Sequence, residues 1–292
     1  MKQIAIIGST ASGKTSLALD IAKKTDSIIL SLDSLSVYKQ IDIASAKPTV
    51  QERGDIIHFG IDEVYANETF DVIQFIDCYQ RAKKFAQNNK KNLIIVGGTG
   101  FYLKALVEGI STGIDTKNKL DIPKEEAYDI LYNLDKEYME KIAPNDTYRI
   151  EKAYSIYTQS GMTPTQFFKK NKKIPIIENL QIFEIVWQRD DLRKRIALRT
   201  KQMLEDGLID EVIFLEKTYT REPNCMSAIG IIETLEYLDG KLTKKELEEK
   251  ILTNTAKLAK RQNTFNKSQF VENKSSNIIE NLNSEILKFF SL

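Results

Sequence analysis

The amino-acid sequence predicts an α/β fold, in which a parallel β-sheet is flanked by helices and a helical segment is inserted between two parts of the core. Short apolar runs typical of buried strands recur along the chain and alternate with longer runs whose apolar residues have helical spacing. Near residue 111 the composition becomes polar and lysine-rich, and the sheet pattern returns near residue 180. We therefore expect residues 1–112 and 179–292 to form the core and residues 113–178 to form a helical insertion.

The first strand and helix flank an eight-residue stretch, GSTASGKT, at positions 8–15. Gln3 to Ile7 has the apolar character of a buried strand, and Ser16 to Lys24 has apolar residues at helical spacing. The stretch fits the pattern GxxxxGK followed by Ser or Thr, whose backbone N–H groups bind phosphate while its lysine and hydroxyl serve phosphate and Mg²⁺. The core is therefore expected to be P-loop NTPase-like, with a helix that opens at Thr15. The residues expected to bind a diphosphate are Gly8, Ser9, Thr10, Ala11, Ser12, Gly13, Lys14 and Thr15, and Thr15 is also the expected contact of Mg²⁺.

A second apolar run, from Ser27 to Leu32, ends in Asp33 and Ser34. Parallel strands place functional groups at their carboxyl ends, so Asp33 should lie beside the phosphate loop. A carboxylate at this edge can act as a base or as a partner of metal-bound water, whereas the alternative is a solvated loop aspartate. The loop-like segment that follows, residues 38–48, could cover the site.

Beyond a short strand at residues 58–61 and an amphipathic helix at residues 70–86, Leu93 to Val96 forms another buried-type strand. P-loop proteins that hydrolyse ATP usually end such a strand in an acidic residue that holds Mg²⁺ through water. This strand ends in Gly-Gly-Thr instead. Thr99 therefore offers a hydroxyl between glycines that permit close approach of a ligand, although a simple turn would also explain it.

The insertion is expected to contain three helices. Pro123, Asp135 and Asn145 or Asp146 are suitable starts, and Gly161 is a suitable end of the third helix. Basic side chains could make this segment a phosphate-contacting surface or merely a solvated face. They are Arg149, Lys152, Lys169, Lys170, Lys172 and Lys173.

The sheet pattern resumes with an apolar run at residues 180–187. A helix that alternates arginines with apolar residues follows and should end at Gly207, and Thr243 begins a capping box for a later helix. Residues 278–290 form a last amphipathic helix.

The protein is nearly neutral overall, because 42 basic and 41 acidic side chains give a net charge of +1. Any nucleic-acid partner must therefore be bound by local patches. Two widely spaced cysteines and a single histidine exclude a histidine-rich metal site and suggest buried thiols in a reducing compartment. No apolar stretch reaches the length of a membrane span, and the N-terminal run leads directly into the phosphate loop, so we expect a cytoplasmic protein without membrane contact.

Together these motifs resemble those of the tRNA dimethylallyltransferases, in the same order and over nearly the whole chain. The matching stretches are GSTASGKT from Gly8, SLDSLSVYKQIDIASAKP from Ser31, VGGTGFYLKAL from Val96, PNDTYRI from Pro144, GMTPTQ from Gly161, MLEDGLIDEV from Met203, AIG from Ala228 and LAKRQNTF from Leu258.

The resemblance implies transfer of a dimethylallyl group from dimethylallyl diphosphate to N6 of an adenine beside the anticodon in tRNA, with release of pyrophosphate. In that family the phosphate loop holds the diphosphate of the prenyl donor rather than ATP. By this resemblance Asp33 is the general base, Thr99 helps to hold the adenine, and Lys14 and Mg²⁺ near Thr15 stabilise the leaving group. The insertion would grip the anticodon loop, and the enzyme is expected to act as a monomer. The residues expected to contact tRNA are Asp33, Ser34, Leu35, Ser36, Thr99, Arg149, Lys257, Lys260, Arg261 and Gln262.

Two positions depart from the family pattern in a way that affects charge. Ser227 stands where arginine or glutamine is frequent, and Ala256 stands where arginine is usual. Since serine and alanine lack the fork that arginine offers to phosphate, contacts at these positions are in question, and Lys257, Lys260 or Arg261 could replace them. Two other functions fit the phosphate loop alone: a nucleoside or nucleotide kinase, and a nucleotide-binding RNA adaptor without chemistry.

Overall fold

The computed structural model describes residues 1–111 and 120–291. The chain divides into two compact units, which we call the core unit (Met1–Val107 with Ile177–Leu292) and the helical unit (Glu108–Ile176). The expected boundary at residues 112 and 113 lies outside the described residues. Among the described residues, no helix is both long and apolar enough to cross a membrane.

The core unit is built on a six-stranded sheet in which every pair of neighbouring strands is parallel, in the order β3-β2-β4-β1-β5-β6. The α/β fold class is therefore confirmed. The central strands are buried at nearly every position because helices cover both faces. The strands are β1 (Gln3–Gly8), β2 (Ser27–Leu32), β3 (His58–Phe59), β4 (Asn92–Gly97), β5 (Gln181–Ile185) and β6 (Lys274–Ser276).

Strand register brings the candidate residues to one edge of this sheet. Leu32 pairs with Gly97, and Ile7 also pairs with Gly97, so the carboxyl ends of β2, β4 and β1 are level. β4 separates β2 from β1. Thr99, which follows β4, therefore lies between Asp33 and the phosphate loop along the edge.

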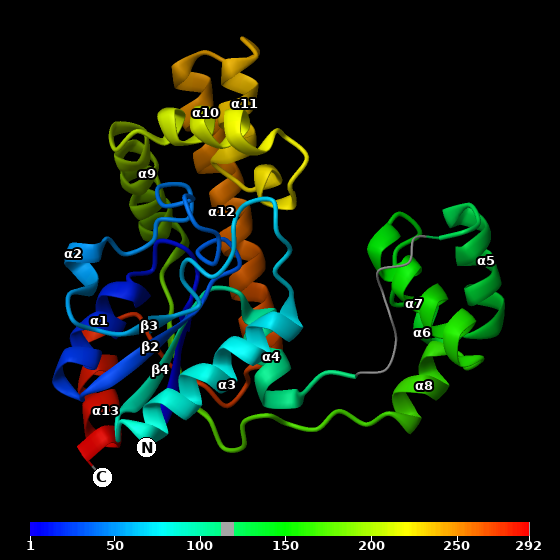
Figure 1. Cartoon of the computed structure of the whole chain (residues 1–292), viewed down its shortest axis with the longest axis horizontal. Helices are drawn as coiled ribbons and strands as arrows, with labels where there is room; N and C mark the ends of the chain where they lie inside the picture. The colour runs from blue at the N-terminus through cyan, green and yellow to red at the C-terminus, as the bar shows by residue number, and fades with distance from the viewer. Residues whose placement is uncertain (112–119, 292) are drawn as a thin grey trace. The chain divides into compact units, whose positions relative to one another are not determined.

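Helices cover the two faces of the sheet (Figure 1). α1 (Lys14–Lys24) and α13 (Ile279–Ser291) share one hydrophobic cluster with alternate residues of the strands, among them Ile4 and Ile6. α3 (Val72–Asn88) packs on the opposite face, where the Tyr79 hydroxyl donates to Gln3 Oε1 at 3.1 Å.

A second group of helices extends from the carboxyl edge of the sheet and includes the long helix α12, which passes beside α9 and returns to the sheet (Figure 1). Its upper part shares a hydrophobic cluster with the segment from Val37 to Ala44. The helices are α9 (Arg189–Glu205), α10 (Leu208–Tyr219), α11 (Ile231–Leu238) and α12 (Lys244–Gln269), with a 3₁₀ turn at Asn224–Ser227 before α11. The remaining helices of the core unit are α2 (Val50–Arg53) and α4 (Gly100–Glu108), whose last residue falls in the helical unit.

The helical unit has a small core of its own, formed by residues such as Leu131, Met139 and Ile150. The expected starts are confirmed: Pro123 precedes α5, Asp135 caps α6, and Asp146 caps α7, which Gly161 ends with a φ of 67°. The helices are α5 (Lys124–Leu134), α6 (Lys136–Met139), α7 (Thr147–Ser160) and α8 (Pro164–Lys170).

Four features differ from the sequence-based expectation. The helical unit contains four helices instead of three, because Thr163 caps the additional helix α8. The first helix begins at Lys14 and not at Thr15, because Gly13 with a φ of 91° already occupies the N-cap position. α10 and α11 were not expected as separate helices, and the polar strand β6 carries no pattern that would reveal it.

Candidate active site

The phosphate loop connects β1 to α1, as its motif requires. A Cβ on Gly8 would lie 2.8 Å from Ser12 Oγ and 2.9 Å from the Ile185 carbonyl oxygen, so only glycine fits there. The Ser12 hydroxyl is buried and has no hydrogen-bond partner in this structure. The N-terminus of α1 adds backbone N–H groups without intrahelical partners and the positive end of the helix dipole. The loop therefore has the properties of an anion site.

Lys14 has an unusual electrostatic environment. Its Nζ donates to the Ser9 carbonyl oxygen at 3.2 Å. Burial, and to a smaller extent the nearby charge of Arg199, lower the pKa of Lys14 to about 8, and Asp33 partly opposes the shift. Since an anion beside this ammonium group would replace lost hydration, the site favours a negatively charged ligand.

Asp33 and Thr99 adjoin each other at the strand ends. Oδ1 of Asp33 accepts hydrogen bonds from the backbone N–H groups of Leu35 at 2.8 Å and Ser36 at 3.0 Å. The Thr99 hydroxyl oxygen accepts from the Ser34 N–H at 3.2 Å, and the Thr99 N–H donates to the Leu32 carbonyl oxygen at 3.0 Å. The carboxylate and the hydroxyl are therefore held in place by the backbone.

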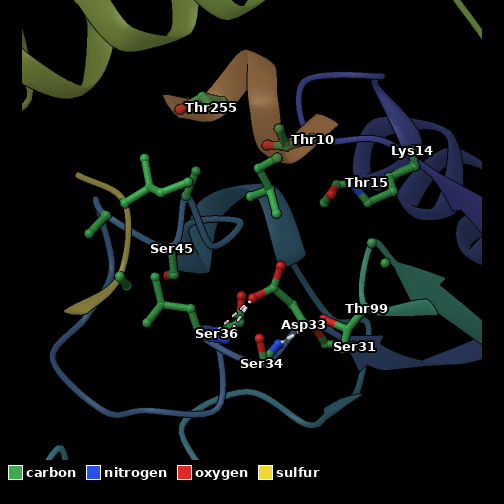
Figure 2. A pocket seen from close by; sticks show the side chains of 18 of the residues that line it. Thr10, Lys14, Thr15, Ser31, Asp33, Ser34, Ser36, Ser45, Thr99 and Thr255 are labelled. Atoms are coloured by element: carbon green, nitrogen blue, oxygen red, sulfur yellow. Dashed lines mark hydrogen bonds between the residues drawn. The ribbon is translucent and has the colours of Figure 1, made fainter. Parts of the chain in front are cut away.

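These groups line one cavity of about 470 Å³, which Figure 2 shows from close by. The phosphate loop contributes one side, the ends of β2 and β4 another, and side chains of α9 and α12 close it. Of the residues predicted from the sequence, nine line this cavity: Thr10, Lys14, Thr15, Asp33, Ser34, Leu35, Ser36, Thr99 and Gln262.

A second cavity of about 1370 Å³ lies on the other side of Lys14 and Thr15. It is bounded by α1, α9 and the segment from Lys39 to Arg53, and it includes Ala11, Ser12 and Gly13 of the loop. The segment that was expected to cover the site therefore forms part of the walls of both cavities.

Gln262 connects two parts of the site. Its Oε1 accepts from the Thr10 N–H at 2.8 Å, and its Nε2 donates to the Gly98 carbonyl oxygen at 3.1 Å. A Cβ on Gly98 would lie 2.5 Å from Gln262 Nε2, which explains the glycine. Gln262 thus joins the phosphate loop to the Gly-Gly-Thr turn, and its expected contact with tRNA stays a prediction.

The other residues expected to contact tRNA lie outside the cavity. Lys257, Lys260 and Arg261 are exposed on α12 and line neither cavity. Arg149 belongs to the helical unit, where its guanidinium lies 3.3 Å from Asp146 Oδ2.

The two departures from the family pattern have different surroundings. Ser227 lines the first cavity, and its hydroxyl donates to the Asn224 carbonyl oxygen at 2.7 Å. Ala256 packs against a small apolar cluster between α9 and α12 that includes Leu192 and Ile196. A methyl group therefore fits the packing at position 256.

Arg199 was not singled out from the sequence, yet it lines both cavities. Burial lowers the pKa of Arg199, and Asp33 raises it. A sequence signal existed: Arg199 shares one helical face with Ile196 and Met203, and an arginine within an apolar face needs a partner or a function.

Glu211 of α10 was also not identified from the sequence as a residue that supports the site. It accepts three consecutive backbone N–H groups, those of Asp42 at 2.7 Å, Ile43 at 2.7 Å and Ala44 at 2.9 Å. This contact fixes the segment that walls both cavities, and no local pattern could reveal it because the partners are more than 160 residues apart.

The family comparison agrees with this architecture. The family model described as IPP transferase matches residues 36–269. The chain belongs to the IPP transferase family. The resemblance that the sequence motifs indicated is therefore confirmed.

Curated relatives match this IPP transferase over nine-tenths or more of its length. A protein named tRNA dimethylallyltransferase from Aliarcobacter butzleri is 68% identical over 292 residues, which cover 100% of both chains. A protein of the same name from Sulfurimonas denitrificans is 54% identical over 277 residues, or 92% of this chain and 93% of the relative.

Solved structures share the fold. The full-length tRNA isopentenylpyrophosphate transferase from Bacillus halodurans has a TM-score of 0.74 at 28% identity, covering 99% of this chain and 97% of that one. A eukaryotic dimethylallyltransferase described as acting on tRNA has a TM-score of 0.78 at 27% identity, covering 91% of this chain and 70% of that one.

Proposed function

We propose that this IPP transferase moves a dimethylallyl group from dimethylallyl diphosphate to N6 of an adenine adjacent to the anticodon in tRNA and releases pyrophosphate. The observation that carries the proposal is the shared cavity, in which Asp33 and Thr99 face the same space as Lys14 and Thr15 of the phosphate loop. One end of the cavity suits a nucleophile and the other suits an anionic leaving group.

On the acceptor side, Asp33 orients the amine and takes its proton. Adenine N6 is a poor nucleophile because its lone pair is delocalised into the ring. Two backbone N–H groups hold Oδ1 of Asp33, so the carboxylate cannot rotate away from its position. The Thr99 oxygen already accepts a hydrogen bond from the Ser34 N–H. The hydroxyl proton of Thr99 is therefore free to be donated to the adenine ring.

On the donor side, the phosphate loop stabilises the negative charge that develops on the leaving diphosphate. The N–H groups at the start of α1 and the ammonium group of Lys14 supply this stabilisation. Arg199 adds a guanidinium that is preorganised by burial between the two cavities. The bond between the allylic carbon and the diphosphate oxygen breaks while the bond from N6 to that carbon forms.

Mg²⁺ fits this site as a partner of the diphosphate. The hydroxyls of Thr15 and Ser12 offer oxygen ligands of the type that Mg²⁺ prefers, and Ser12 Oγ has no partner of its own. Within the described ranges, no three or more His, Cys, Asp or Glu side chains are grouped to hold a metal ion. The Thr15 and Ser12 hydroxyls would therefore hold Mg²⁺ together with oxygens of the diphosphate. When bound, the ion neutralises charge on the leaving group.

tRNA binding requires contacts to phosphates and access to a base that is normally stacked. The adenine must leave the anticodon-loop stack to reach Asp33. The helical unit supplies exposed cationic groups for the backbone of such a loop: Lys169, Lys170, Lys172 and Lys173 around the end of α8, with Arg149 on α7. All the reacting groups come from one chain, so a monomer suffices for the reaction. As an enzyme that modifies tRNA, it would act in the cytoplasm.

The kinase alternative is disfavoured by the end of β4. A Cβ on Gly97 would lie 2.1 Å from the Leu32 carbonyl oxygen, so no acidic residue fits at the position where ATP-hydrolysing P-loop proteins hold Mg²⁺ through water.

The test incubates the protein with Mg²⁺, total tRNA and one of three donors: dimethylallyl diphosphate, isopentenyl diphosphate or ATP. Mass analysis of the digested tRNA should detect prenylated adenosine only when the donor is dimethylallyl diphosphate, because isopentenyl diphosphate has no allylic leaving group. Lys14→Ala is the negative control. Absence of prenylated adenosine, or phosphate transfer from ATP, would refute the proposal.

A further inference from the structure

Two side chains from outside the phosphate loop hold its carbonyl groups. Nε1 of Trp187, just after β5, donates to the Ser12 carbonyl oxygen at 2.9 Å. Nε of Arg195, on α9, donates to the Ala11 carbonyl oxygen at 2.7 Å. The Arg195 guanidinium also lies 4.6 Å from the centroid of the Trp187 ring, so the two donors support each other.

These bonds determine the direction of the loop's N–H groups. Across a trans peptide bond the C=O of one residue and the N–H of the next point in opposite directions, and the chain has no cis peptide bond among its described residues. A donor that holds the Ser12 carbonyl therefore turns the Gly13 N–H away from Trp187 and towards the anion side of the loop. The bond to Ala11 likewise turns the Ser12 N–H inward, where it donates to the Ser9 carbonyl oxygen at 3.2 Å and closes the loop.

Without these donors the same peptides could rotate. Gly13 has a φ of 91° and no side chain, so its backbone crosses between conformations at low cost. A carbonyl that turned into the loop would repel a diphosphate. The Arg195 guanidinium also lies close to Gly13, since a Cβ built at this position would be 3.2 Å from Arg195 Nη2.

We propose that Trp187 and Arg195 are positioning residues that hold the phosphate loop in its diphosphate-binding conformation before the donor arrives. The inference rests on the proposed function, since it takes the loop's ligand to be a diphosphate. Neither residue has to touch the donor. They act through the Ala11 and Ser12 carbonyls, and they lower the cost of ordering the loop on binding.

Trp187 provides its own spectroscopic readout. It is the only tryptophan in the sequence, and its indole N–H is bonded to the loop. The fluorescence of the whole protein therefore reports on the contact between this ring and the loop. Titration with inorganic pyrophosphate and Mg²⁺ should shift the wild-type emission saturably.

Trp187→Phe separates the hydrogen bond from charge and packing, because it removes the N–H donor, keeps an aromatic ring over Arg195 and leaves the charge unchanged. Arg195→Met removes the second donor together with a positive charge. Arg193→Met is the matched control, because it removes an exposed arginine two positions earlier on the same helix.

The experiment measures affinity for pyrophosphate by calorimetry and affinity for tRNA by a binding titration. Each of the two test variants should bind pyrophosphate about threefold to tenfold more weakly, the effect of one lost hydrogen bond, with affinity for tRNA unchanged and the ligand-free melting temperature lowered by only a few degrees. Arg193→Met should behave as wild type. The conservative Trp187→Phe variant carries the test if Arg195→Met proves unstable.

Two outcomes would overturn the inference. Wild-type affinity for pyrophosphate in both variants would show that the carbonyl bonds do not position the loop. An equal loss of affinity for pyrophosphate and for tRNA, together with a large drop in the ligand-free melting temperature, would show a general structural role. A wild-type protein that neither binds pyrophosphate nor transfers the prenyl group would refute the proposed function itself, and with it the inference.

Discussion

Replacement of Lys14 by methionine should stabilise the ligand-free protein at neutral pH while it abolishes binding of the diphosphate. The pKa of Lys14 falls from 10.5 to about 8 because the ammonium group is desolvated beside Arg199. A shift of about 2.5 units corresponds to about 3 kcal/mol, an upper bound since cavity water screens the charge. The variant also loses the bond to the Ser9 carbonyl, about 1 kcal/mol. The net expectation is a gain of at most about 2 kcal/mol.

The sign of the effect can be checked through its pH dependence. Below pH 8 Lys14 is charged in both the folded and the unfolded protein, so the folded wild type carries the full penalty. Between pH 8 and 10.5 the unfolded chain binds the proton and the folded protein does not, so wild-type stability rises with pH. The advantage of Lys14→Met should therefore shrink across this window.

The assay is urea unfolding of wild type and variant at pH 7 and at a pH in the upper part of that window, with and without pyrophosphate. Lys24→Met, which removes an exposed lysine of the same helix and its ion pair with Asp20, is the control and should not be stabilised at pH 7. Pyrophosphate should stabilise the wild type and not Lys14→Met. The reasoning fails if the variant is less stable than wild type at pH 7, or if pyrophosphate stabilises both proteins equally.

Three further predictions concern the partner and the walls of the site. Affinity for tRNA should fall steeply with rising salt concentration despite the net charge of +1, and a flat wild-type response would contradict this. Charge reversal of the basic cluster around the end of α8, which consists of Lys169, Lys170, Lys172 and Lys173, should flatten the slope. Gly98→Ala should displace Gln262, whose Nε2 would lie 2.5 Å from the new Cβ, and should slow single-turnover prenyl transfer; an unchanged rate would exclude this role of Gln262. Glu211→Gln should lower the free energy of unfolding by about 1–3 kcal/mol, because one amide oxygen cannot accept three N–H groups; an unchanged urea midpoint would exclude this role.

The features that the sequence predicted well have local causes. The phosphate loop lies within eight residues, and the caps at Asp135, Asp146 and Thr243 each act on the turn that follows them. The strand ends at Asp33 and Thr99 are marked by the change from apolar to polar residues. Parallel packing then brings these ends to one edge without further information.

The features that were missed depend on contacts between distant parts of the chain. Trp187 and Arg195 meet the loop across more than 170 residues, and Glu211 meets its N–H partners across more than 160. The strand β6 is polar and forms because β5 offers it a free edge. Periodicity and capping rules describe neighbours in sequence, so they do not register such partners.

The most direct test of the central claim is single-turnover prenyl transfer by Asp33→Asn with tRNA and dimethylallyl diphosphate both saturating. Asparagine keeps the size of the side chain and an acceptor oxygen for the Leu35 and Ser36 N–H groups, but it removes the charge and most of the basicity. We expect a rate about 10²-fold to 10⁴-fold lower, the usual contribution of a positioned base, with affinities for both substrates nearly unchanged. Transfer at the wild-type rate, or a loss explained wholly by weaker tRNA binding, would contradict it.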